Sequence, residues 1–216
     1  MTKKNKRTLL NWGIAGILML LLLIWHGAFE SPLTPAEVEH YLTRYQEQHP
    51  EADTDRLRRF LEEDDGKPIV MVNAIKLYET PIEVNGQSFG GSSEEVLSEY
   101  TGFVLPYLIV RGSYPIYSGN AVFEAMEKWG IENAEEWSSG ALMRYRSRRV
   151  MLEMSTDPVF DQFHDAKIAA IEKTFAFPAT TVLSVGSLPL MVGLILLSLA
   201  LGVQLLINGR WSGNDE

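Results

Sequence analysis

The sequence predicts an α+β domain that is tethered to a membrane at both ends. One observation is a pair of charge-free apolar runs, Leu9 to Trp25 and Val182 to Ile207. The other is an alternation of strand-like and helix-like segments between these runs. Because roughly 20 apolar residues suffice to span a bilayer as a helix, both runs are candidate membrane spans.

We expect five parts along the chain. They are a basic tail with the first transmembrane helix (1–29), a helical arm (30–66), the α+β domain (67–181), the second transmembrane helix (182–208) and a short tail (209–216). Four basic residues precede the first run, and Lys and Arg beside a span tend to stay in the cytoplasm. Arg210 follows the second run. Both termini are therefore expected in the cytoplasm, with the central domain on the periplasmic or extracellular side of the cytoplasmic membrane.

A cleavable signal peptide is the competing interpretation of the first run. The run is longer than the roughly 7–15 apolar residues of a signal peptide, and His26-Gly27-Ala28 is a poor cleavage site. An uncleaved anchor is the favoured interpretation.

Charge and composition limit the classes of partner that the chain is expected to bind. Residues 30–181 hold 14 Lys and Arg against 26 Asp and Glu, a net charge of −12, which disfavours nucleic acid. The expected partners are the lipid bilayer, through the two spans, and either further copies of the chain or a larger membrane complex. The absence of cysteine excludes disulfides, thiolate metal sites and a cysteine nucleophile.

The arm is predicted to be helical, and the first strand of the domain to be central. Thr34 and Glu37 have the spacing of a capping box, and a second short helix is expected over 54–63. The segment Ile69 to Ile75 is apolar on both faces, which is typical of a strand with neighbours on both sides. Asn85-Gly86 is a two-residue hairpin signal.

The remaining segments give an order of strands and helices that is typical of a known fold. Ser92 and Glu95 begin a helix that runs to about 110, two strands are expected at 114–121 and 140–146, a helix runs from Asp157 to about Thr174, and a last strand covers 175–183. Strand, helix, strand, strand, helix, strand is the order of a ferredoxin-like βαββαβ sandwich. Its sheet has one face without helices, which predicts a homodimer or an equivalent covering partner.

Several segments between residues 68 and 182 resemble an uncharacterised family of the dimeric α/β-barrel superfamily. They are Met71 to Lys76, Leu142 to Arg149, Met151 to Met154 and Asp157 to Phe160. The resemblance implies a ferredoxin-like fold, and its relatives include small quinol-type monooxygenases and haem-binding barrel proteins. The two spans, the arm and the Asn85-Gly86 hairpin depart from the usual member, and they disfavour a diffusible cytosolic enzyme.

Each candidate functional residue has a structural and a functional interpretation. Asn73 interrupts an apolar strand, so its amide must bond either to the neighbouring backbone or to a ligand. His164 is the single imidazole of the resembling region and is either a core residue or an acid/base, metal or haem ligand. The arginines after residue 143 either hold an anionic ligand or pair with Glu153 and the acidic arm. The ligand-binding candidates are Asn73, Tyr100, Tyr107, Arg144, Arg146 and Arg148.

The function that these observations favour is binding or assembly without catalysis, as a membrane-anchored accessory subunit that needs no metal or cofactor. The alternative is a small oxidoreductase or monooxygenase-like enzyme, or a haem-binding barrel, that acts on a small aromatic or lipid-derived substrate. In that alternative Asn73, Arg144, Tyr145 and His164 would meet in a cleft between two sheets.

Overall fold

The structure is a computed structural model that describes residues 1–184 and 186–212, without the side chains of residues 161, 162 and 210–212. Residues 213–216 of the expected tail (209–216) and the side chain of Arg210 therefore lie outside the described residues. The chain divides into two compact units, and each is described by itself. One unit joins residues 1–29 to 182–216, and the other comprises residues 30–181.

The first unit is a pair of apolar helices, α1 (Lys3–His26) and α7 (Leu188–Ser212). Both are long and apolar enough to cross a membrane. Only 0% and 6% of their most apolar windows are buried, so they are not the core helices of a water-soluble domain. Helix α7 begins six residues after the start of the second apolar run. Val182 and Leu183, at the start of that run, are exposed and not helical.

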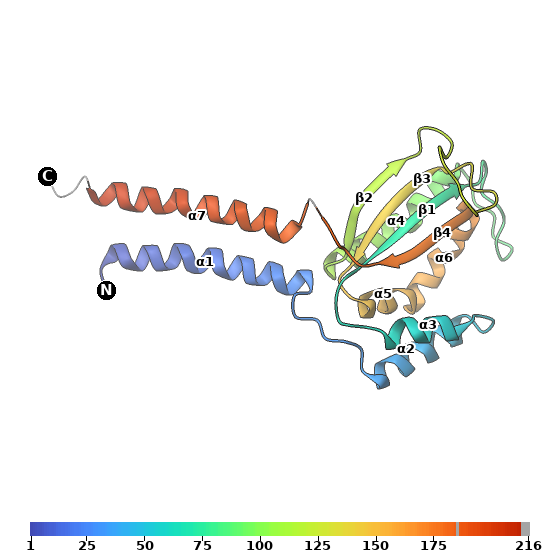
Figure 1. Ribbon diagram of the computed structural model, residues 1–216, viewed down its shortest axis with the longest axis horizontal. Helices are drawn as coiled ribbons and strands as arrows, with labels where there is room; N and C mark the ends of the chain where they lie inside the picture. The colour runs from blue at the N-terminus through green and yellow to red at the C-terminus, as the bar shows by residue number, and fades with distance from the viewer. Residues whose placement is uncertain (185, 213–216) are drawn as a thin grey trace. The chain divides into compact units, whose positions relative to one another are not determined.

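Helices α1 and α7 pack against each other (Figure 1) and are joined by polar side chains. The Asn11 amide donates to the carbonyl oxygen of Ala200 at 2.8 Å, and the Gln204 amide donates to the Thr8 hydroxyl at 3.1 Å. In a bilayer such groups need partners inside the protein, since lipid tails offer none. These contacts therefore fix the register between the two helices.

The second unit is built on a four-stranded antiparallel sheet, which confirms the predicted α+β class. Its strands are β1 (Ile69–Leu77), β2 (Tyr114–Asn120), β3 (Ser139–Tyr145) and β4 (Ile171–Ala179), in the order β2-β3-β1-β4. Strand β1 lies between β3 and β4, as its two apolar faces predicted.

The second unit also contains five helices. They are α2 (Pro35–Gln48), α3 (Thr54–Glu62), α4 (Ser93–Val110), α5 (Arg148–Ser155) and α6 (Pro158–Ala170). The expected capping boxes begin α2, where Thr34 pairs with Glu37, and α4, where Ser92 pairs with Glu95. Helices α4, α5 and α6 lie on one face of the sheet (Figure 1).

The main core fills the space between these helices and the sheet. Strand residues Ile69 and Tyr145 pack there against Leu108 of α4, Met154 of α5 and Phe160 of α6. Because side chains alternate along a strand, this contact fixes which residues of β1 and β3 face the helices and which face away from them.

The structure has one element that was not expected, and two expected elements differ in it. Helix α5 was not predicted, because it is only two turns long and directly precedes α6. The last helix ends at Ala170 and not near Thr174, since Ile171 already pairs with Leu77 and begins β4 four residues early. Around Asn85-Gly86 a tight turn forms with a single bridge, Val84 to Gln87, and no flanking strands.

The arm is part of the compact second unit. Val38 and Leu42 of α2, together with Leu61 of α3, pack on Leu152 of α5. Leu61 and Leu152 are each 1% exposed. This apolar contact fixes the arm on the helix layer.

Gly66, where the arm meets the first strand, provides a test of this docking. Its φ is +73°, and a Cβ there would lie 2.8 Å from the carbonyl carbon of Ser31 and 2.9 Å from the nitrogen of Pro32. Gly86 has a similar φ of +77° and open space around it. We therefore predict that Gly66→Ala lowers the Tm of the detergent-solubilised chain by more than twice the few degrees expected for Gly86→Ala. Equal losses of Tm would show that the backbone of Ser31 and Pro32, at the start of the arm, does not restrict the space at Gly66.

Candidate functional site

The face of the sheet without helices carries an apolar row. Tyr117 of β2 is directly opposite Leu142 of β3, which is opposite Val72 of β1, which in turn is opposite Phe177 of β4. Directly opposite residues share a face, so these four side chains form one line across all four strands. Phe175 lies beside the line, with its ring 5.6 Å from that of Phe177.

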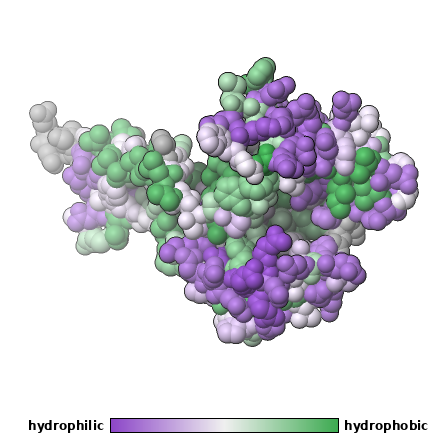
Figure 2. Space-filling view, turned by 45° about the vertical axis from the view of Figure 1, so that its right-hand side comes forward, coloured by the Kyte–Doolittle hydropathy of each residue, from purple (hydrophilic) through white to green (hydrophobic). Residues whose placement is uncertain are grey.

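This row is open to solvent. Tyr117 is 56% exposed, Phe175 is 54% exposed and Phe177 is 43% exposed. Figure 2 shows hydrophobic surface in the middle of the domain, between hydrophilic regions above and below it. A contiguous apolar surface of this kind is typical of a protein or membrane interaction site.

The arginines after β3 hold the arm. Arg146 forms an ion pair with Glu30, Arg149 with Glu37 at 3.0 Å, and Arg148 with Asp64 at 3.5 Å. The carboxylate of Asp64 also accepts the backbone N–H of Leu33 at 2.8 Å. The structure therefore shows these three arginines paired with the acidic arm, which was one of the two interpretations of the arginine cluster.

Arg144 and Asn73 lie apart from each other. Asn73 is opposite Ala141, whereas Arg144 is opposite Val70, so their side chains point to opposite faces of the sheet. The Asn73 amide donates to the backbone carbonyls of Met71 (2.9 Å) and Ala141 (3.3 Å). The backbone therefore satisfies this amide within the sheet.

Arg144 is buried, with 7% of the residue exposed. Its guanidinium donates to the carbonyl of Gly112 at 2.9 Å, and the guanidinium carbon atom lies 5.4 Å from the centre of the Tyr114 ring. Burial lowers the pKa of Arg144. These contacts connect β3 to the turn that precedes β2.

Two of the tyrosine candidates belong to the main core. Tyr145 is 8% exposed, and burial raises its pKa, so its hydroxyl stays protonated at neutral pH. Tyr107 packs edge-on against Phe160, and the guanidinium of Arg111 lies 3.5 Å from the centre of its ring. Asn73, Arg144, Tyr145 and His164 thus do not meet in one cleft.

His164 lies in a different place, a cavity of about 360 Å³ between the arm and the helix layer. Its ring centre is 6.0 Å from that of His49 in the arm. The residues that line the cavity are Tyr45, His49, Ala52, Tyr100, Met154, Ser155, Phe160, His164 and Lys167. The structure therefore brings Tyr100 and His164 together among the predicted residues.

His49 and Lys167 were not predicted to belong to this site. His49 follows α2, and the end of that helix is held by Arg44 and Gln48, which donate to the carbonyl of Thr156 at 2.5 and 3.1 Å. These contacts join segments more than 100 residues apart, so no local pattern could have indicated them. Lys167 is three residues after His164, and this i, i+3 spacing was the available signal.

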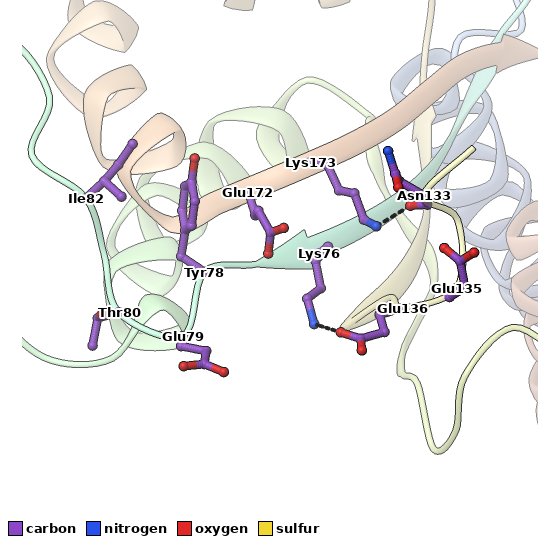
Figure 3. Close-up of a pocket in the computed structure, with 10 residues that line it drawn as sticks. All are labelled: Lys76, Tyr78, Glu79, Thr80, Ile82, Asn133, Glu135, Glu136, Glu172 and Lys173. Carbon is purple, nitrogen blue, oxygen red and sulfur yellow. Dashed lines mark hydrogen bonds and ion pairs between the residues drawn. The ribbon is translucent and has the colours of Figure 1, made fainter. Parts of the chain in front are cut away.

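A second depression, of about 900 Å³, lies where β1 and β4 meet the loop between β2 and β3. Figure 3 shows the ammonium of Lys76 reaching the carboxylate of Glu136, at 2.7 Å, and that of Lys173 reaching the carbonyl of Asn133. Both ammonium groups of this depression therefore already have partners within it.

Within the described part of the chain, no group of three or more His, Asp or Glu side chains could hold a metal ion. The imidazoles of His49 and His164 lie with their ring centres 6.0 Å apart. A haem bound at His164 stays a prediction.

Comparison with known proteins gives a fold and no activity. No protein-family model and no curated protein matches the chain. The fold is similar to that of RPA0582, a protein of unknown function from Rhodopseudomonas palustris, with 19% identity, a TM-score of 0.51, and coverage of 63% of this chain and 98% of that one. A structure of methylated RPA0582 matches with 23% identity, a TM-score of 0.52, and coverage of 64% and 98%.

Acid is predicted to weaken the attachment of the arm. The pKa of Glu37 is lowered from 4.5 to about 2, first by its hydrogen bond with Arg149 and then by the backbone N–H of Thr34. The stability from this depressed pKa is fully present above pH 4.5 and is lost as the pH falls towards 2. The Glu37 side chain is 35% exposed, so we expect a loss of only about 1 kcal/mol.

The measurement compares the wild type with Glu37→Gln by thermal unfolding between pH 2 and pH 6. The wild type should be the more stable chain near pH 6, and the two should converge near pH 2. A difference that does not depend on pH would contradict the assignment.

Proposed function

We propose that this chain is a membrane-anchored assembly protein without catalytic activity, whose outer domain associates with a second copy through the helix-free face of its sheet. The observation that carries the proposal is the exposed row formed by Tyr117, Leu142, Val72 and Phe177. Covering the exposed half of each aromatic ring would contribute roughly 2 kcal/mol per ring.

The order of the elements supports a ferredoxin-like assignment of this domain. Helix α4 connects β1 to β2, helices α5 and α6 connect β3 to β4, and the strand order is β2-β3-β1-β4. Helices on one face leave the other face for a partner, and two such faces pack about 10 Å apart in sheet-on-sheet interfaces.

A second copy is the partner that the chain itself supplies. Both candidate spans would confine every copy to the same membrane in the same orientation, which raises the effective concentration of one outer domain near another. A closed two-fold pair covers the row of each copy with the row of the other. The net charge of −12 disfavours an anionic lipid surface as the covering partner instead.

The proposed topology has both termini in the cytoplasm and the second unit outside the cytoplasmic membrane. Its support is the four basic residues in the first turns of α1, Lys3, Lys4, Lys6 and Arg7, together with the antiparallel passage that two spans require. The hydrogen bonds of Asn11 and Gln204 across α1 and α7 also favour an α1 that is retained and not cleaved.

Cysteine cross-linking tests the pairing without background, because the chain has no cysteine. Phe177 is 43% exposed on the sheet face, and Ile168 is 42% exposed on α6, so the two positions are matched in exposure. We predict that a short bismaleimide converts full-length Phe177→Cys in native membranes to a dimer at least about fivefold more efficiently than Ile168→Cys, since only the first position lies in the buried pair. Equal yields, or cross-links to a different protein, would overturn pairing with a second copy.

Topology is tested with two further single-cysteine chains. Met126, in the loop between β2 and β3, is 88% exposed, and Thr2 precedes α1. A membrane-impermeant maleimide should label Met126→Cys in intact spheroplasts and Thr2→Cys only after lysis, because charged reagents do not cross the bilayer. The reverse pattern would invert the topology.

A further inference from the structure

The cavity beside His164 is a feature that the assembly role leaves unused. Its volume of about 360 Å³ falls within the usual size of small-molecule sites. The walls come from the arm and from helices α4, α5 and α6, and none of the described strand residues lines it. It therefore lies outside the sheet and apart from the proposed pairing face.

The lining of the cavity includes nitrogen groups that can bind an anion. The imidazole rings of His49 and His164 are 6.0 Å apart. The ammonium of Lys167 lies on the same helix as His164 and is 5.7 Å from the centre of the Tyr100 ring. Among the described side chains that line the cavity there is no carboxylate, although the surrounding unit has a net charge of −12.

The burial of the Lys167 ammonium favours a bound anion in this cavity. Burial lowers the pKa of its ammonium, which means that the cavity removes this charge from water. A bound anion would offset that desolvation, because an opposite charge in contact favours the charged form.

Most of the remaining lining residues are aromatic or apolar, and Ser155 is the polar exception. Tyr45 from the arm, Tyr100 from α4 and Phe160 from α6 present aromatic rings, and Met154 adds a flexible apolar side chain. Such walls favour a planar ring, which stacks against aromatic side chains.

We propose that this cavity binds a small aromatic carboxylate, with its ring among Tyr45, Tyr100 and Phe160 and its carboxylate directed to Lys167 and the two imidazoles. The arm completes the site, because Tyr45 and His49 form its outer wall. The inference does not depend on the pairing of the sheet faces.

The test uses the full-length chain in detergent and calorimetric titration with 2-naphthoate and its neutral counterpart, 2-naphthamide. We expect 2-naphthoate to bind with a Kd below about 1 mM and 2-naphthamide at least about tenfold more weakly. Absence of binding in this range, or equal affinity for the two compounds, would overturn the proposal.

Variants assign the charge recognition to Lys167. Lys167→Met should weaken 2-naphthoate at least about tenfold and leave 2-naphthamide unchanged, while Lys167→Arg should retain most of the affinity. The matched control is Lys173→Met, because Lys173 lies in the separate depression near Asn133. The same loss in both methionine variants would contradict a specific site.

Two more variants keep the result independent of folding and of assembly. If Lys167→Met does not fold by circular dichroism, His49→Gln in the arm should still reduce 2-naphthoate affinity about threefold or more, through the loss of one imidazole. An unchanged affinity in His49→Gln would remove the arm from the site. Phe177→Glu, which should disrupt pairing, should leave the titration unchanged, so failure of pairing and failure of binding are distinguishable.

Discussion

The attachment of the arm to the domain is the interaction on which the rest of the second unit depends. Arg146, Arg148 and Arg149 follow β3 and pair with Glu30, Asp64 and Glu37 of the arm. Asp64 is 1% exposed at its side chain, so losing Arg148 would leave a buried carboxylate without its counter-charge. Apolar packing of Leu61 on Leu152 supports the same contact.

The cavity is a consequence of that attachment. The arm helix α2 ends where Arg44 and Gln48 donate to the carbonyl of Thr156, and this places Tyr45 and His49 opposite α6. Without the arm, His164 and Lys167 would lie on an open helix surface. The arm, which follows α1 and precedes β1 along the chain, therefore also forms a wall of this cavity.

The two faces of the sheet differ in packing because side chains alternate between the faces along each strand. On one face Ile69 and Tyr145 complete the core beneath α4, α5 and α6. On the other, Val72 and Leu142 continue a row that ends in the exposed rings of Tyr117 and Phe177. The alternation also separates Asn73 from Arg144, because the register places their side chains on opposite faces of the sheet.

The sequence by itself determined the elements whose signals are local. Capping boxes at Thr34 and Ser92, the apolar runs of the spans and the two-sided apolar strand at Ile69 each depend on a few neighbouring residues. Only the tertiary structure decided the strand register, the end of α6 at Ala170, the pairing of the arginines with the arm, and the approach of His49 to His164. Those contacts join residues that lie from about 20 to nearly 120 positions apart, and their partners are selected by packing and charge in three dimensions, which no pattern along the chain encodes.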